Sequence, residues 1–129
     1  MKRRLIGEEL TGRSILRLPV AQGAKLLDGD IVVLNAEGYA VKASKTAGLV
    51  AAGKAQEYVD NTAGDNGACH VRVQRGVFVL GNDGDIKETD LLKTCYFAGP
   101  LSVTLVSAGS SVAGKIIAVE GKAVVVDMV

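Results

Sequence analysis

The chain has 129 residues, 48% of them hydrophobic, and its 15 basic and 14 acidic residues leave a net charge of +1. A chain of this length is expected to form one domain that buries about two-thirds of its unfolded surface. A charged content of 22% excludes the disordered class, and the near-neutral balance gives no electrostatic basis for sequence-independent binding of nucleic acid. With one His and two Cys, the composition favours a structural module over an enzyme.

The N-terminal segment differs in charge from the rest of the chain. Up to Lys25 there are six basic and two acidic residues, a charge of +4, whereas the remainder has nine basic and twelve acidic residues, a charge of −3. We predict an N-terminal arm over residues 1–20 that orders against a partner, followed by a single β domain over residues 21–129. Residues 13–20 are apolar enough that part of this arm should pair as a strand. A frayed terminus is the competing interpretation.

The elements that follow are nearly all strands, because apolar residues recur with period two. A short helix is expected only around residues 86–92, and Gly-containing turns such as Glu120-Gly121 separate the strands. The predicted fold class is therefore all-β, a small, tulip-like β-barrel or sandwich with an extended N-terminal arm. The expected strands are 14–18, 31–34, 39–43, 49–59, 69–75, 77–80, 94–97, 103–107, 112–119 and 122–128.

Two segments in the first half of the chain have similar counterparts in the second half, which suggests an internal duplication. Residues 29–33 followed by residues 50–54 have an echo in residues 89–92 followed by residues 112–115. The echo matches Asp30 with Asp90, 60 positions later, and Gly53 with Gly114, 61 positions later. Two similar hairpin units of this kind would close on each other into one barrel-like core.

The N-terminus and the cysteines indicate where the protein is made. The apolar run at Leu5 and Ile6 ends too soon for a signal peptide. Residues 94–114 carry no charge, but Gly and Pro break this run and Ser and Thr alternate with apolar residues, so we expect strands and no membrane contact. Cys69 and Cys95 are too few for a disulfide framework, and buried free thiols are favoured over a single bridge. We expect synthesis in the cytoplasm.

No segment has the pattern of a catalytic or metal site. His70 lies inside a predicted strand with no link to a nucleophile, and adjacent strand residues such as Cys69 and His70 point to opposite faces. Residues 53–55 lack the second Gly, the Ser or Thr and the helix of a phosphate loop. The acidic residues 82–90 do not fit the register of a helix-loop-helix calcium site and are interpreted as a solvated turn. We therefore predict no catalytic, cofactor-binding or metal-ligating residue.

Seven segments carry a family likeness: residues 26–34, 38–43, 50–55, 60–62, 71–78, 112–117 and 123–126. Together they cover most of residues 20–129 and resemble the capsid cement, or head decoration, proteins of tailed bacteriophages. The resemblance implies a β-rich protein that binds the outside of an assembled icosahedral capsid, commonly as a trimer, and clamps neighbouring major capsid subunits after shell expansion. It also implies the major capsid protein as partner, a place on the outer surface of the virion and no catalytic residues.

We hypothesise that the arm contacts the capsid and that the β body makes the homotrimer. Strand addition by the arm would supply main-chain hydrogen bonds without demanding particular side chains. The alternative is a non-viral β-barrel accessory, ligand-binding or carrier-type module. A carrier would need an exposed Lys in a hairpin turn, and Lys122 lies in such a turn but lacks the usual Met or Asp neighbour. An enzyme is a third class, disfavoured by the missing site. The candidate capsid-binding residues are Arg3, Arg4, Leu5, Ile6, Leu10, Arg13, Ile15, Leu16 and Arg17.

Overall fold

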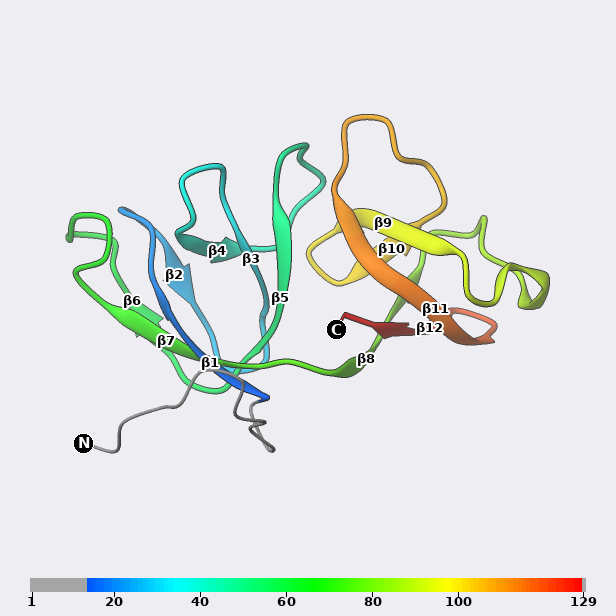
Figure 1. The fold of residues 1–129 in the computed structure, drawn as a ribbon, viewed down its shortest axis with the longest axis horizontal. Coiled ribbons are helices and arrows are strands. Elements are labelled where there is room, and N and C mark those ends of the chain that lie inside the picture. The colour runs from blue at the N-terminus through cyan, green and yellow to red at the C-terminus, as the bar shows by residue number, and fades with distance from the viewer. Residues whose placement is uncertain (1–13, 129) are drawn as a thin grey trace, which may run out of the picture.

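The computed structural model describes residues 14–128, which form two lobes of short strands lying side by side (Figure 1). The predicted all-β fold is confirmed. No helix within the described residues is long and apolar enough to cross a membrane. The first lobe, residues 14–75, contains β1 (Ile15–Pro19), β2 (Lys25–Leu26), β3 (Ile31–Leu34), β4 (Ala40–Lys42), β5 (Val50–Ala55), β6 (Val59–Asp60) and β7 (His70–Gln74). The second lobe, residues 76–128, contains β8 (Val77–Asn82), the 3-10 helix η1 (Glu88–Asp90), β9 (Thr94–Gly99), β10 (Ser102–Thr104), β11 (Val112–Glu120) and β12 (Ala123–Asp127).

The first lobe is a curved five-stranded sheet in the order β1-β7-β5-β3-β4. Its two ends approach each other, because Val20 forms a parallel bridge with Ala40 and the amide of Ala21 donates to the carbonyl of Ala40 (3.0 Å). The small β2-β6 sheet adds Leu26 and Val59 to the core of this lobe. The predicted pairing of part of the arm is observed, since β1 belongs to this sheet.

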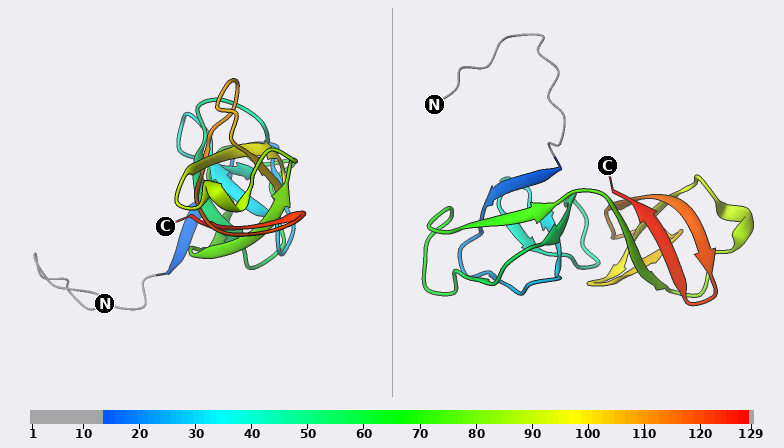
Figure 2. Two further views of the ribbon diagram at one scale, coloured as in Figure 1. Left: turned by 90° about the vertical axis from the view of Figure 1, so that its right-hand side faces the viewer. Right: turned by 90° about the horizontal axis from the view of Figure 1, so that it is seen from below.

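The second lobe is a closed barrel in the order β10-β8-β12-β11-β9. A short parallel contact between β10 and β8 closes it, with Val103 opposite Asn82 and the amide of Asp83 donating to the carbonyl of Val103 (3.0 Å). Figure 2 shows this barrel from its end and the two lobes from below, joined by the chain that runs from β7 into β8.

The two lobes repeat the same strand pairing. β1, β3, β4, β5 and β7 correspond in order to β8, β9, β10, β11 and β12, and both lobes close through the same parallel contact. The registers agree residue by residue. Leu18 lies opposite Val71 in the first lobe, and Leu80 lies opposite Val124 in the second. The internal duplication suggested by the sequence is therefore present in the fold.

Gly53 and Gly114 are equivalent residues of this duplication, as predicted. Each lies next to a register shift, in β5 and β11 respectively. A Cβ added at Gly53 would overlap the backbone carbonyl of Gln74, and one added at Gly114 would overlap that of Asp127. Both lobes thus need glycine at the same place, because a neighbouring strand passes too close for any side chain.

The predicted match of Asp30 with Asp90 is wrong. The carbonyl of Asp30 accepts a hydrogen bond from the amide of Ala55 (2.8 Å), and the corresponding bond in the second lobe runs from the amide of Ile116 to the carbonyl of Lys93 (3.0 Å). Lys93 is therefore the counterpart of Asp30. Asp90 lies one turn earlier, where its carbonyl accepts the amide of Lys93 (3.2 Å). The two short segments are alike in sequence, but they do not occupy equivalent positions in the two lobes.

Two further elements differ from expectation. The helix expected over residues 86–92 is reduced to η1, because the backbone is extended on both sides of it, at Lys87 (φ −121°, ψ 164°) and at Leu91 (φ −57°, ψ 139°). The strand expected over residues 49–59 is divided into β5 and β6, and β2 was not predicted, since two residues carry no periodic signal.

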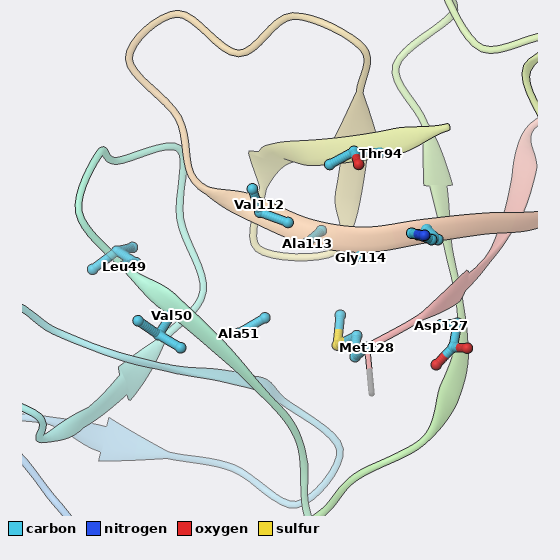
Figure 3. A pocket seen from close by; sticks show the side chains of 10 residues that line it. Leu49, Val50, Ala51, Thr94, Val112, Ala113, Gly114, Asp127 and Met128 are labelled. Carbon is cyan, nitrogen blue, oxygen red and sulfur yellow. The ribbon is translucent and has the colours of Figure 1, made fainter. Parts of the chain in front are cut away.

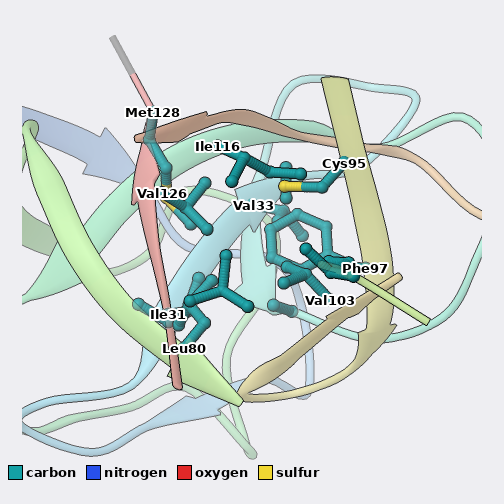
Figure 4. Close-up of a cluster of buried hydrophobic side chains, with 13 residues drawn as sticks. Ile31, Val33, Leu80, Cys95, Phe97, Val103, Ile116, Val126 and Met128 are labelled. Carbon is teal, nitrogen blue, oxygen red and sulfur yellow. The ribbon is translucent and has the colours of Figure 1, made fainter. Parts of the chain in front are cut away.

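The two lobes share a buried core. Ile31, Val33 and Ala43 of the first lobe belong to the same cluster as the second lobe's Phe97 and Leu80, and all five side chains are at most 3% exposed. Figure 4 shows Ile31 and Val33 pointing into the cluster formed by the barrel. Side chains of the first lobe thus complete one side of the core of the second lobe, and the two lobes pack together as one body.

Candidate interaction surfaces

The structure describes three of the nine predicted capsid-binding residues. Ile15, Leu16 and Arg17 lie in β1, where Ile15 and Arg17 are exposed on one face and Leu16 is half-buried on the other. The other six lie outside the described residues: Arg3, Arg4, Leu5, Ile6, Leu10 and Arg13.

β1 forms one end of the five-stranded sheet. Among the residues that the structure describes, β7 is its only strand partner, with Leu16 opposite Val73 and Arg17 opposite Arg72. The carbonyl of Ser14 accepts a hydrogen bond from the amide of Arg75 (2.7 Å), which fixes the point at which residues 1–13 join the body. An edge strand of this kind presents unpaired backbone groups to which a further strand can be added.

The outer face of β1 and β7 is charged. Arg17 and Arg72 lie directly opposite each other across the two strands, and both are exposed. Glu57 accepts a hydrogen bond from the amide of Arg72 (2.9 Å), and its carboxylate lies 3.6 Å from Nε of the same side chain. This carboxylate partly offsets the repulsion between the two arginines, and the face as a whole is well hydrated.

The corresponding outer face of the second lobe is apolar. Val79 lies opposite Val125, which in turn lies opposite Ala118 on β11. Val77 and Val79 are 53% and 68% exposed. At these three positions the strands lack the polar outward residues that a sheet with one solvated face normally shows. The sequence indicates apolar residues on both faces of these strands, since residues 77–80 and 124–126 are apolar without alternation. It does not indicate which face is exposed to solvent.

A cavity of about 460 Å³ lies between the two lobes, bordered by β5, β11 and the end of β12 (Figure 3). Leu49, Val50 and Ala51 line one side, and Val112 and Met128 line another. The amide of Leu49 donates to Oγ of Ser111 (2.9 Å), which ties the two lobes together at this cavity. The lining is mainly apolar, and its size falls within the range of small-molecule sites.

The acidic loop of residues 82–90 is more ordered than the solvated turn that was expected. Oδ2 of Asp85 accepts hydrogen bonds from Oγ1 of Thr104 (2.7 Å) and the amide of Leu105 (3.0 Å). Burial raises the pKa of Asp85, but these two bonds outweigh it and leave the pKa below its ordinary value of 3.8. Asp90 accepts hydrogen bonds from Nζ of Lys93 (2.9 Å) and the amide of Lys87 (2.8 Å), which lower its pKa. Both carboxylates anchor the loop.

The remaining candidates for chemistry lie apart from one another. His70 is exposed at the start of β7, and no group of three His, Cys, Asp or Glu within residues 14–128 is placed to hold a metal ion. Both cysteines are free. Sγ of Cys69 lies 3.5 Å from Oδ1 of Asn61, whereas Cys95 is fully buried and burial raises its pKa to about 11.

Comparison of the whole chain with protein-family models, with curated proteins and with solved structures finds no match.

Proposed function

We propose that this chain is a decoration, or capsid cement, protein of a tailed bacteriophage. In this role it binds the outer surface of the assembled, expanded capsid and stabilises contacts between major capsid subunits. The N-terminal arm supplies the capsid contact and the β body forms a homotrimer. The virion is its place of action, after synthesis in the host cytoplasm.

One observation carries the proposal: β1 is an edge strand that leads directly out of the basic, apolar segment 1–13. A strand at the end of a sheet can extend its hydrogen bonding to a partner chain. Ile15 and Arg17 are exposed on β1, so an apolar and a basic contact accompany the free edge. The packed body behind β1, with a core shared by both lobes, gives such a contact a rigid base.

The test removes residues 1–13 of the arm and keeps every strand of the body. A chain that begins at Ser14 keeps β1 and every described strand, so it should fold, which a thermal melt verifies. Co-sedimentation with expanded, DNA-free heads of the encoding phage then measures binding. We expect the full chain to sediment with the heads and the truncated chain to stay in the supernatant.

A matched control separates charge from apolar contact within the arm. Arg3→Ser with Arg4→Ser keeps the arm's length and Leu5, Ile6 and Leu10. This variant should bind the heads more weakly than the full chain at low salt and about equally at high salt. Its salt dependence is smaller because fewer charges are screened. Undiminished binding by the truncated chain would contradict the proposal.

The cavity between β5 and β11 favours a second candidate, a ligand-binding module for small apolar compounds. A cavity of about 460 Å³ can hold a ligand of modest size, and Met128 gives it an adaptable wall. Thermal melts with a set of apolar probes test this function, because a ligand bound at 100 times its Kd stabilises the fold by about 2.7 kcal/mol. Val112→Arg, half-exposed at the cavity rim, should remove any such shift.

A further inference from the structure

The second lobe carries an exposed apolar face that its own fold does not require. This apolar face consists of side chains on β8, β11, β12 and the turn before β10. Three of its members, Val77, Val79 and Leu101, are each more than half exposed. Exposed apolar patches that continue across several strands mark interaction sites in soluble proteins. Its residues are Val77, Val79, Leu101, Ile117, Ala118 and Val125.

The duplication provides an internal control for this face. Val79 is the third residue of β8, and Arg17 is the third residue of the equivalent strand β1. The two residues therefore correspond to each other. By the same registers, Val125 corresponds to Arg72. The first lobe forms the same pairing with two arginines there. The strand pairing is therefore compatible with charged side chains, and the valines of the second lobe need another explanation.

A third pair of equivalent residues, next to these two on the sheet, shows the same contrast. In the first lobe Glu57 pairs with Arg72, and 61 positions later, the spacing that relates Gly53 to Gly114, the second lobe has Ala118 opposite Val125. A charged row in one lobe thus corresponds to an apolar row in the other. On a sheet face that stays in contact with water, apolar residues in place of three charged ones do not stabilise the fold.

The charges around the apolar face indicate what covers it. Its rim carries charges of both signs, with the cations Lys54, Lys115 and Lys122 and the carboxylates Glu120 and Asp127. The centre bears no formal charge, so a second copy can cover the face without burying like charges against it. Two copies can place the cations of one rim against the carboxylates of the other. We infer that the apolar face of the second lobe binds a second copy of this chain.

The size of the face sets the expected strength of self-association. Six apolar residues and five at the rim are about half of the 20–30 residues that each partner contributes to a standard interface. Association is therefore expected near micromolar concentrations, where monomer and oligomer coexist. The inference rests on the part of the proposed function that assigns self-association to the β body, and it names the surface involved.

The decisive variant transfers the charged row of the first lobe to the second. Val79→Arg, Val125→Arg and Ala118→Glu together place arginine, arginine and glutamate at the positions that correspond to Arg17, Arg72 and Glu57. The first lobe carries the two arginines on paired strands, and it carries the glutamate just after β5. The control is Val106→Arg, which adds a charge at a residue 52% exposed in the segment between β10 and β11, a segment that contributes no residue to this face. Thermal melts establish that both variants fold.

Sedimentation velocity of the full chain at roughly 1–200 µM, a range chosen to bracket a micromolar Kd, measures the association. We expect the mass of the wild type and of Val106→Arg to rise with concentration above 13.3 kDa, and that of the triple variant to stay at 13.3 kDa. A wild type that is monomeric throughout, or a triple variant that associates like it, would overturn the inference.

Co-sedimentation with phage heads distinguishes this failure from failure of the proposed function. If the chain starting at Ser14 still associates but no longer binds heads, both ideas stand. If the wild type is monomeric and the triple variant loses head binding, the face contacts the capsid, and the second copy is the wrong occupant.

Discussion

Leu92 occupies in the second lobe the position that Gly29 occupies in the first. The amide of Gly29 donates to the carbonyl of Ala55 (2.9 Å), and the amide of Leu92 donates to the carbonyl of Ile116 (2.7 Å). Both residues have positive φ, 95° at Gly29 and 67° at Leu92. The duplication therefore conserves a left-handed turn but places a leucine, 70% exposed, where the backbone favours glycine.

Leu92→Gly should stabilise the protein. A non-glycine residue in the left-handed region costs about 1–2 kcal/mol, part of which the greater flexibility of glycine in the unfolded chain offsets. We expect a net gain of about 1 kcal/mol and a rise in Tm of about 4 °C. Thermal and urea melts measure it. The reciprocal change, Gly29→Leu, should lower stability by a similar amount, and equal melts for both variants would disprove the strain.

Gly114→Ala should destabilise the protein far more than an alanine at an ordinary turn. The new Cβ would overlap the carbonyl of Asp127, so β11 and β12 would have to separate, and we expect a loss of about 3 kcal/mol or more. The control is Gly121→Ala, where φ is 63° but the surroundings are open, with an expected loss of about 1 kcal/mol. Urea denaturation compares the two. Similar midpoints would show that the close approach at Gly114 is unimportant.

The equivalence of Gly53 and Gly114 also shows how far the sequence alone could lead. Alternating apolar residues, as in Val71 and Val73, were enough to predict the strands and the all-β class, because burial on one face imposes period two. The two glycines indicated the duplication because the fold admits no other residue there. The match of Asp30 with Asp90 failed, since a two-residue likeness carries no information about register.

The interaction surfaces were harder to predict from the sequence. Exposure of Ile15 and Arg17 on an edge strand follows from sheet order, and sheet order depends on long-range pairing that no local pattern encodes. The apolar row through Val79 and Val125 was visible as a run of valines, but the same run fits a strand buried on both faces. The arginines at the equivalent positions of the first lobe show that the strand pairing itself does not require these valines.

Acid should weaken the second lobe through Asp85. Its pKa is below the ordinary value of 3.8 in the folded protein, because hydrogen bonds from Thr104 and Leu105 outweigh the effect of burial. A lowered folded pKa means that the stabilisation is complete above the unfolded pKa and is lost as the pH falls through the folded one. We therefore expect Tm to be level from pH 7 to about 5 and to fall below about pH 4.

Asp85→Asn tests the origin of that fall. The amide oxygen can still accept from Thr104, but the new NH₂ group takes the place of Oδ1, which is buried without a hydrogen-bond partner. The variant should be less stable at pH 7 by about 1–3 kcal/mol, and its Tm should decline less between pH 5 and pH 3. A decline as steep as that of the wild type would assign the acid sensitivity to other carboxylates.

The two thiols should differ sharply in reactivity. Burial raises the pKa of Cys95 to about 11, so very little thiolate forms at pH 8, and its side chain is inaccessible in the barrel core. Cys69 is only half-buried in the first lobe. A thiol reagent at pH 8 should modify Cys69 at least about 100-fold faster than Cys95 in the folded protein, and both equally in denaturant. Cys69→Ala should abolish the fast phase and Cys95→Ala should keep it. A chain with no reactive thiol before reduction, but two after it, would instead contain a bridge between the lobes.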